Sequence, residues 1–120
     1  MRKQVKIKRV YDDPAGSDGT RVLVDRIWPR GLTQERAAVD VWLKAIAPTT
    51  ELRKWFGHDP ARWKEFQARD RSELDRNGDA VSQVREIIAR GTVTLLYGAH
   101  DEAHNDAVVL LGCLDGKPER

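Results

Sequence analysis

The sequence predicts an α/β fold, a small and mostly parallel sheet covered by helices, and three observations support this prediction. The segments around Val22 and Val93 are short, β-branched and apolar on both faces, as strands of a helix-covered sheet are. Segments with helical periodicity lie between them, which makes the two strands a parallel crossover pair. The chain has 120 residues, a length typical of one domain over residues 1–120.

Composition excludes several classes of protein. Twenty-one Lys and Arg against 19 Asp and Glu leave a net charge of +2, so net charge alone does not require a nucleic-acid or membrane partner. The longest apolar run, Ala107 to Leu114, has eight residues, far below the ~20 of a membrane-spanning helix. One cysteine, Cys113, excludes an internal disulfide framework. With no secretory signal visible, we expect a cytoplasmic protein.

The chain begins with an alternating strand. Val5, Ile7 and Arg9 point to one side and Lys6 and Lys8 to the other, a pattern typical of an edge strand with one wet face. Turn-forming residues over 12–19 end this strand. Because the connection to the next strand is short for a parallel crossover, we expect the first strand to run antiparallel.

The second strand is expected over Arg21–Trp28, where Pro29 ends it. Thr33 is expected to cap a helix that runs to Ile46 with a regular apolar stripe, and Pro48 stops it. Further segments follow in order: helices over 49–57, 59–76 and 79–90, a buried strand over 92–97, and a helix capped near Asn105 that holds the apolar run to Leu114.

Charged and aromatic residues follow the buried strands, where ligands bind in open α/β sheets. Asp25 and Arg26 stand at the end of the second strand, and an ion without a partner in the interior costs several kcal/mol. They therefore pair with each other or face a wet cleft. Arg26 and Arg30 offer guanidinium forks suited to carboxylate or phosphate, with Trp28 as a stacking surface. The alternative is a structural ion pair, with Trp28 in the core.

Four other features have a structural alternative at least as strong. The Gly16–Gly19 segment could cradle an anion, but it lacks the ending of a phosphate loop and is better explained as a connecting turn. His100 and His104 share a helical face, as metal ligands do, but without a third ligand at the usual spacing they are better explained as loop histidines, and we assign no metal site. Cys113 is expected to be an inert core thiol. The basic residues near the N-terminus, which are Arg2, Lys3, Lys6, Lys8 and Arg9, could contact phosphate or simply protect a sheet edge.

Several motifs together resemble a known family. They are Ser17-Asp18-Gly19, the stretch Arg21 to Leu32 with its Val-Asp-Arg-Ile-Trp-Pro-Arg-Gly sequence, Pro48 to Phe56, Leu95-Leu96-Tyr97 and Asn105-Asp106-Ala107. Nearly end to end, the chain resembles the short, YeaO-like branch of the domain-of-unknown-function 488 family. The resemblance implies a small cytoplasmic α/β domain. It also implies a shared site formed by Asp18, Asp25, Arg26, Trp28, Arg30, Tyr97 and Asn105.

Longer relatives carry a cysteine where Tyr97 stands and a Cys-His-Arg triplet at Asn105-Asp106-Ala107. This chain has neither cysteine, so a thiol or metal role does not carry over. The leading hypothesis is a cleft for an anionic or nucleotide-like small molecule, with no cofactor identified. The rival is a nucleic-acid or protein interaction module that uses the basic first strand and the charged third helix. A metalloenzyme using His100 and His104 is the third.

Overall fold

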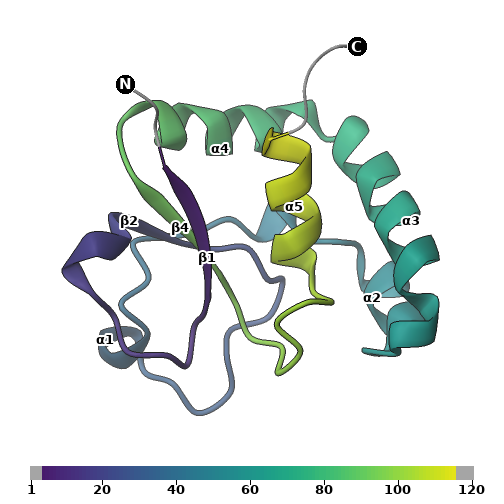
Figure 1. The fold of residues 1–120 in the computed structure, drawn as a ribbon, viewed down its shortest axis with the longest axis horizontal. Helices are drawn as coiled ribbons and strands as arrows, with labels where there is room; N and C mark the ends of the chain where they lie inside the picture. The colour runs from purple at the N-terminus through teal and green to yellow at the C-terminus, as the bar shows by residue number, and fades with distance from the viewer. Residues whose placement is uncertain (1–3, 116–120) are drawn as a thin grey trace.

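The computed structural model describes residues 4–115, and its centre is a four-stranded parallel sheet (Figure 1). The strands are β1 (Val5–Arg9), β2 (Thr20–Leu23), β3 (Val41–Trp42) and β4 (Val93–Tyr97). They lie in the order β1-β4-β2-β3, and every neighbouring pair runs parallel. The predicted α/β class, with its parallel pairing of the second strand and the Val93 strand, is confirmed.

The antiparallel orientation predicted for the first strand is wrong. β1 pairs parallel with β4, with Ile7 opposite Leu95, and β4 separates β1 from β2. The segment from Val10 to Gly19 therefore does not join hydrogen-bonded neighbours. Ten extended residues span ~33 Å, which is enough to return along one strand and to cross two strand spacings of ~5 Å each. A short connection is thus compatible with parallel strands, and β1 is an edge strand as expected.

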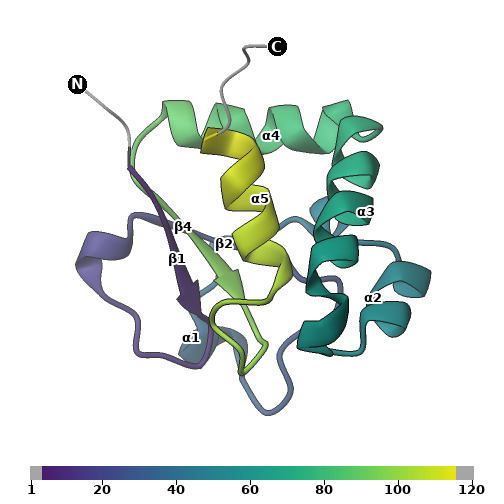
Figure 2. The same ribbon diagram turned by 45° about the vertical axis from the view of Figure 1, so that its right-hand side comes forward.

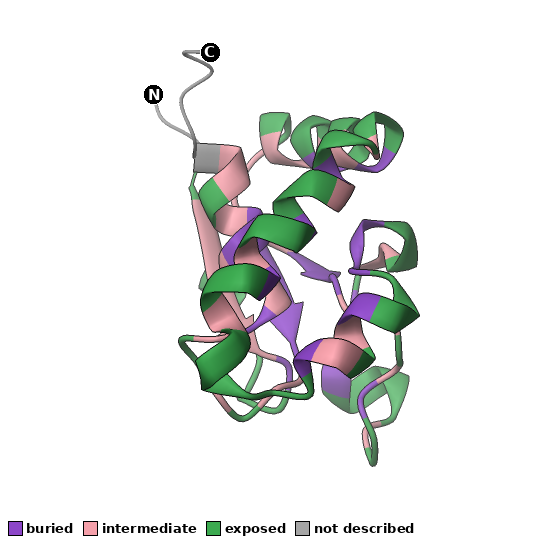
Figure 3. Cartoon of the chain, turned by 90° about the vertical axis from the view of Figure 1, so that its right-hand side faces the viewer, coloured by how far each residue is buried: buried purple, intermediate pink, exposed green. Residues whose placement is uncertain are grey.

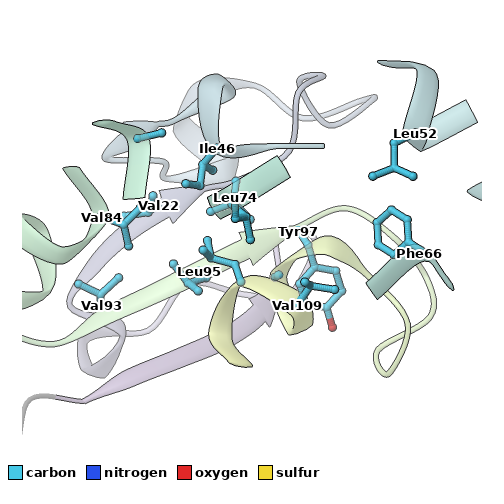
Figure 4. Packing of buried hydrophobic residues seen from close by; sticks show 14 of the residues in the cluster. Val22, Ile46, Leu52, Phe66, Leu74, Val84, Val93, Leu95, Tyr97 and Val109 are labelled. Atoms are coloured by element: carbon cyan, nitrogen blue, oxygen red, sulfur yellow. The ribbon is translucent and has the colours of Figure 1, made fainter. Parts of the chain in front are cut away.

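Alternate residues of the central strands point into two separate apolar clusters. Val22 on β2 and Leu95 on β4 belong to the larger cluster, together with residues of α2 to α5, as Figure 4 shows. Leu23 and Leu96 face the other side and pack with Ala37 and Val39. The sheet is buried on both faces, so the apolar composition predicted for its two central strands follows from their position.

Four helices cover one face of the sheet (Figures 1 and 2). They are α2 (Thr50–Phe56), α3 (Trp63–Asp75), α4 (Gly78–Ala89) and α5 (Asp106–Asp115). Figure 3 shows exposed residues on their outer sides and buried residues toward the sheet. The helices predicted in these regions are confirmed, including the cap at Asn105, whose Oδ1 accepts a hydrogen bond from the Val108 N–H at 3.1 Å.

The helix predicted from Thr33 to Ile46 is wrong. α1 covers only Gln34–Ala37, because Ala38 takes a left-handed conformation with φ of 51° and ends it. Asp40 then binds the backbone of Arg21 twice, once through its N–H and once through its carboxylate. These bonds align Val41–Trp42 as strand β3 on the edge of β2. Pairing with an available strand therefore outweighs the helical spacing of the apolar residues.

The second strand is shorter than the predicted Arg21–Trp28. β2 ends at Leu23, although the Val24 N–H still donates to the Leu96 carbonyl at 3.1 Å. From Asp25 onward the chain leaves the sheet, and the Asp25 carboxylate, rather than its backbone, accepts a hydrogen bond from the Gly98 N–H at 2.8 Å. The charged residues after Val24 are therefore outside the sheet.

A buried ion cluster ties the turn before β2 to strands β1 and β2. Asp18, in the 3₁₀ turn Gly16–Asp18, accepts hydrogen bonds from Arg21 at 2.6 Å and from Lys8 at 3.0 Å, and it is 3% exposed. The remaining Arg21 donors bind the carbonyls of Ala37 and Ala38. Burial by itself raises the pKa of Asp18, but these partners and the Ala15 N–H outweigh burial and lower it to about 2. Asp18 is thus a structural residue.

A second buried carboxyl group, that of Asp70, lies on α3. It is 2% exposed, and its Oδ1 finds no hydrogen-bond partner among the described residues. Burial, together with the nearby charge of Glu73, raises the pKa of Asp70 to about 7. An ionised Asp70 therefore destabilises the folded protein, because the unfolded chain solvates that charge better.

Replacing Asp18 should be strongly destabilising. Asp18→Ala leaves Arg21 as a buried charge without its partner, so we expect a loss of about 3–5 kcal/mol in the free energy of unfolding. Urea denaturation of purified protein measures the change. Asp13→Ala, in the exposed part of the same connection, is the control and should change stability by less than about 0.5 kcal/mol. Equal effects of the two substitutions would contradict a structural role for Asp18.

Asp70 should make stability fall as pH rises. Its folded pKa of about 7 lies above the ordinary value of 3.8, so its destabilising effect is absent below about pH 4 and complete above about pH 7. Across that range the expected loss is at most about 4 kcal/mol, at ~1.4 kcal/mol per pKa unit. Asp70→Asn removes this dependence, whereas Asp75→Asn, at an exposed position of α3, keeps it. Parallel pH profiles of denaturation for wild type and Asp70→Asn would show that Asp70 does not titrate in this range.

Candidate functional site

A cavity of about 590 Å³ lies at the carboxyl ends of β2 and β4. Residues 25–30 after β2 and, after β4, residues 98–101 with 105–106 form two of its walls. The third wall comes from α2 and its flanking residues, with Phe66 of α3 behind it. This is the position at which ligands bind in open parallel sheets. The cavity therefore lies where the sequence predicts a site.

Two carboxyl groups meet at the cavity. Asp25 follows β2 and Asp106 begins α5, and their side chains share a hydrogen bond. Burial, and then the adjacent Asp25 charge, raises the pKa of Asp106 well above its ordinary value. Burial also raises the pKa of Asp25, while the hydrogen bonds with Asp106 and the Gly98 N–H and the nearby His58 and Arg53 act in the opposite direction. Both shifts oppose ionisation of the second carboxyl, as in two adjacent acids that share a proton.

Three arginines line the same cavity. Arg26 is held in place, because its Nε donates to the Pro48 carbonyl at 3.1 Å and its Nη2 to the Ala47 carbonyl at 3.2 Å. Arg30 lies at the exposed rim. Arg53, from α2, is half-buried in the wall, and its Nε has no hydrogen-bond partner among the described residues. The three guanidinium groups thus bring positive charge to the strand-end wall, the rim and the α2 wall of the cavity.

The aromatic residues are arranged differently from the prediction. Trp28 lines the cavity, but its Nε1 donates to the Leu32 carbonyl at 2.7 Å and its ring packs edge-on against Trp42. Tyr97 does not line the cavity and is buried in the core beside Val109 (Figure 4). The apolar wall consists instead of Phe56 and Phe66, whose rings stack with centroids 4.3 Å apart.

The structure brings together five of the seven predicted site residues and separates two. Asp25, Arg26, Trp28, Arg30 and Asn105 line the cavity. Asn105 is held by both ends of its amide, since its Nδ2 donates to the Asp101 carbonyl and its Oδ1 caps α5. Asp18 lies outside the cavity, in the ion cluster before β2, and Tyr97 lies in the core. Their side chains serve the fold, so of the seven predicted residues only the other five can contact a ligand in this cavity.

The two histidines after β4 lie in the connection that precedes α5, not on one helical face. His100 lines the cavity, whereas the ring of His104 binds Asp101 at 2.8 Å and packs edge-on against Trp63. The helical spacing used to compare them with zinc ligands is therefore not realised. Within residues 4–115, no three His, Cys, Asp or Glu side chains are grouped as a metal site would require.

The basic first strand uses several of its charges within the chain. Lys8 binds Asp18, Lys6 donates to the Ser17 carbonyl, and Arg9 donates to the Ala99 carbonyl at 2.9 Å. Arg2 and Lys3, which the prediction includes in this basic surface, lie outside the described residues.

Cys113 of α5 is half-buried and packs against the larger apolar cluster. Burial raises the pKa of its thiol. No helix among the described residues combines the length and hydropathy needed to cross a membrane.

Sequence reasoning missed the wall that α2 contributes. Arg53, Phe56 and His58 line the cavity but lie more than twenty residues from either strand end in the chain. Helical spacing places Phe56 on the apolar face of its helix, but it does not show which end of the sheet α2 approaches. The one available signal was that Arg53 and Phe56 lie within the Pro48–Phe56 motif on which the family resemblance rests.

Comparison with known proteins identifies similar chains. The family model described as the inactive DUF488-N3 subclade matches residues 4–120. The uncharacterized protein Rv3073c of Mycobacterium tuberculosis is 40% identical over 114 residues, which cover 95% of this chain and 96% of the relative. The uncharacterized protein YeaO of Escherichia coli is 40% identical over 106 residues, or 88% of this chain and 92% of YeaO. No solved structure gives a significant match.

The family model spans nearly the whole chain, and the similarity to YeaO covers most of both proteins. These matches agree with the motifs from Arg21 to Leu32 and from Pro48 to Phe56. The chain belongs to the YeaO-like branch of the DUF488 family.

Proposed function

We propose that this protein is a cytoplasmic binding protein for a small anionic or nucleotide-like molecule, which it holds in the cavity at the carboxyl ends of the strands. The convergence of Arg26, Arg30 and Arg53 on one cavity carries this proposal. Guanidinium groups bind phosphate and carboxylate through paired hydrogen bonds. The cavity volume of about 590 Å³ lies within the usual range for small-molecule sites.

Binding without catalysis is the simpler form of this proposal. The matching family model is described as an inactive subclade, and a ligand can be retained after the chemistry performed on it is lost. The polar groups of the cavity also suit recognition, because Arg26 and Asn105 are held by the backbone in fixed positions. Fixed donors reduce the entropy lost when a ligand binds.

The rival function, a nucleic-acid or protein interaction module on the basic first strand and the charged helix α3, receives less support from the strand. On β1, Lys8 and Arg9 have partners within the chain. We therefore favour the cavity over the basic strand as the site of function.

An anionic probe should stabilise the protein. We expect AMP, at about 100 times its dissociation constant, to add about 2.7 kcal/mol to the free energy of unfolding and to raise the melting temperature. Adenosine, which lacks the phosphate, should give a much smaller shift at the same concentration. A thermal-shift series with both compounds measures the difference. If neither AMP nor a wider set of anionic metabolites changes the melting temperature, the proposed function is wrong.

Arg30→Lys should weaken AMP binding although the charge is retained, because the planar fork is lost. We expect about a tenfold increase in the dissociation constant, measured by isothermal titration calorimetry. Arg36→Lys, an exposed substitution on α1, is the matched control and should leave the constant unchanged. If Arg30→Lys behaves like the control, Arg30 does not bind the anion through paired hydrogen bonds.

A further inference from the structure

Arg53 is the least satisfied charged group of the cavity. Its Nε is buried without a hydrogen-bond partner among the described residues, and none of the salt bridges within residues 4–115 includes its guanidinium. By contrast, the buried Arg21 in the ion cluster before β2 binds one carboxylate and two carbonyls. A half-buried guanidinium in a cavity wall gains most from a ligand that brings an acceptor to it.

The backbone beside Arg53 is also unusual. α2 ends at Gly57 with φ of 54°, and His58 takes a second left-handed conformation with φ of 58°. A residue other than glycine adopts this conformation rarely, and such residues cluster at functional sites. The turn brings His58 to the same cavity wall as Arg53. Both side chains act on the Asp25 carboxylate through their charge, so all three lie in one electrostatic environment.

The carboxyl pair of Asp25 and Asp106 offers hydrogen-bond acceptors, whereas the guanidinium of Arg53 offers donors. Asp25 has one oxygen occupied by the Gly98 N–H, and it accepts the proton of Asp106. The lone pairs that remain on the oxygens of the pair accept hydrogen bonds, and the carboxylate of the pair is negatively charged. They suit hydroxyl or amino donors of a ligand and repel its anionic group. The charges therefore give a bound molecule one orientation, with its anion toward Arg53 and its donors toward the pair.

Resting on the proposed function, we infer that the cavity binds a phosphorylated polyol, such as a sugar phosphate or the ribose phosphate part of a nucleotide. Arg53 is the anchor of its phosphate, and Asp25 and Asp106 bind its hydroxyl groups. Phe56 and Phe66 supply the apolar wall beside the carbon skeleton. This assigns a ligand class to the site and a role to Arg53.

Calorimetric titration with three probes tests this inference. Ribose 5-phosphate has both groups, inorganic phosphate has only the anion, and ribose has only the hydroxyls. We expect ribose 5-phosphate to bind at least about tenfold more tightly than phosphate, and ribose not to bind measurably. Arg53→Gln should weaken ribose 5-phosphate by at least about tenfold. Lys54→Gln removes the same charge at the next, exposed position of α2 and should have little effect.

Variants of Asp106 separate the two halves of the site. Asp106→Ala should lower the affinity for ribose 5-phosphate by a much larger factor than the affinity for phosphate. Asp106→Asn keeps a donor toward Asp25 and an acceptor toward the ligand, so it should retain affinity within about threefold. It also tests the site if Asp106→Ala fails to fold.

Several outcomes would overturn the inference and leave the proposed function standing. One is that AMP binds but ribose 5-phosphate does not. Another is that phosphate binds as tightly as ribose 5-phosphate. The third is that Arg53→Gln binds ribose 5-phosphate like wild type while Arg30→Gln does not. If no anionic probe binds at all, the inference and the proposed function fall together.

Discussion

The carboxylate of Asp25 joins three segments that are far apart in the chain. It follows β2, accepts the N–H of Gly98 at the end of β4, and shares a proton with Asp106 at the start of α5. Without this carboxylate, the ends of two neighbouring strands and the first turn of α5 would lose their common partner. The cavity walls therefore depend on one half-buried acid whose charge is only partly compensated.

The ion cluster before β2 and the cavity at the strand ends differ in how completely their charges are paired. In the cluster, Asp18, Arg21 and Lys8 are matched with one another and with backbone carbonyls, which fixes the connection between β1 and β2. At the cavity, the Arg53 Nε has no acceptor among the described residues, and two acids share one proton. A fold can carry such incomplete pairing where a ligand completes it, and natural proteins place such groups mainly at functional sites.

Local sequence patterns predict the elements whose ends are set by neighbouring residues. They fail where pairing between distant segments sets the structure. Turn residues, proline stops and caps place α2 to α5, and buried strand composition places β2 and β4. The helical spacing before Ile46 is overridden, because Asp40 binds the backbone of Arg21 and adds β3 to the sheet. Asp25 and Arg30 are found by their place after a strand. Arg53 and His58 are not, because only the packed structure shows which end of the sheet α2 approaches.

The central claim is that Asp25 and Asp106 share one proton at the cavity. Carbon NMR of protein labelled at the aspartate carboxyl groups follows each carboxyl through a pH titration, and Asp106→Asn assigns the signals of the pair. The structure predicts that one carboxyl of the pair stays protonated well above the ordinary aspartate pKa, because burial and its neighbour oppose ionisation. If both carboxyls ionise near pH 4, as an exposed aspartate does, the cavity has no shared proton and the claim is wrong.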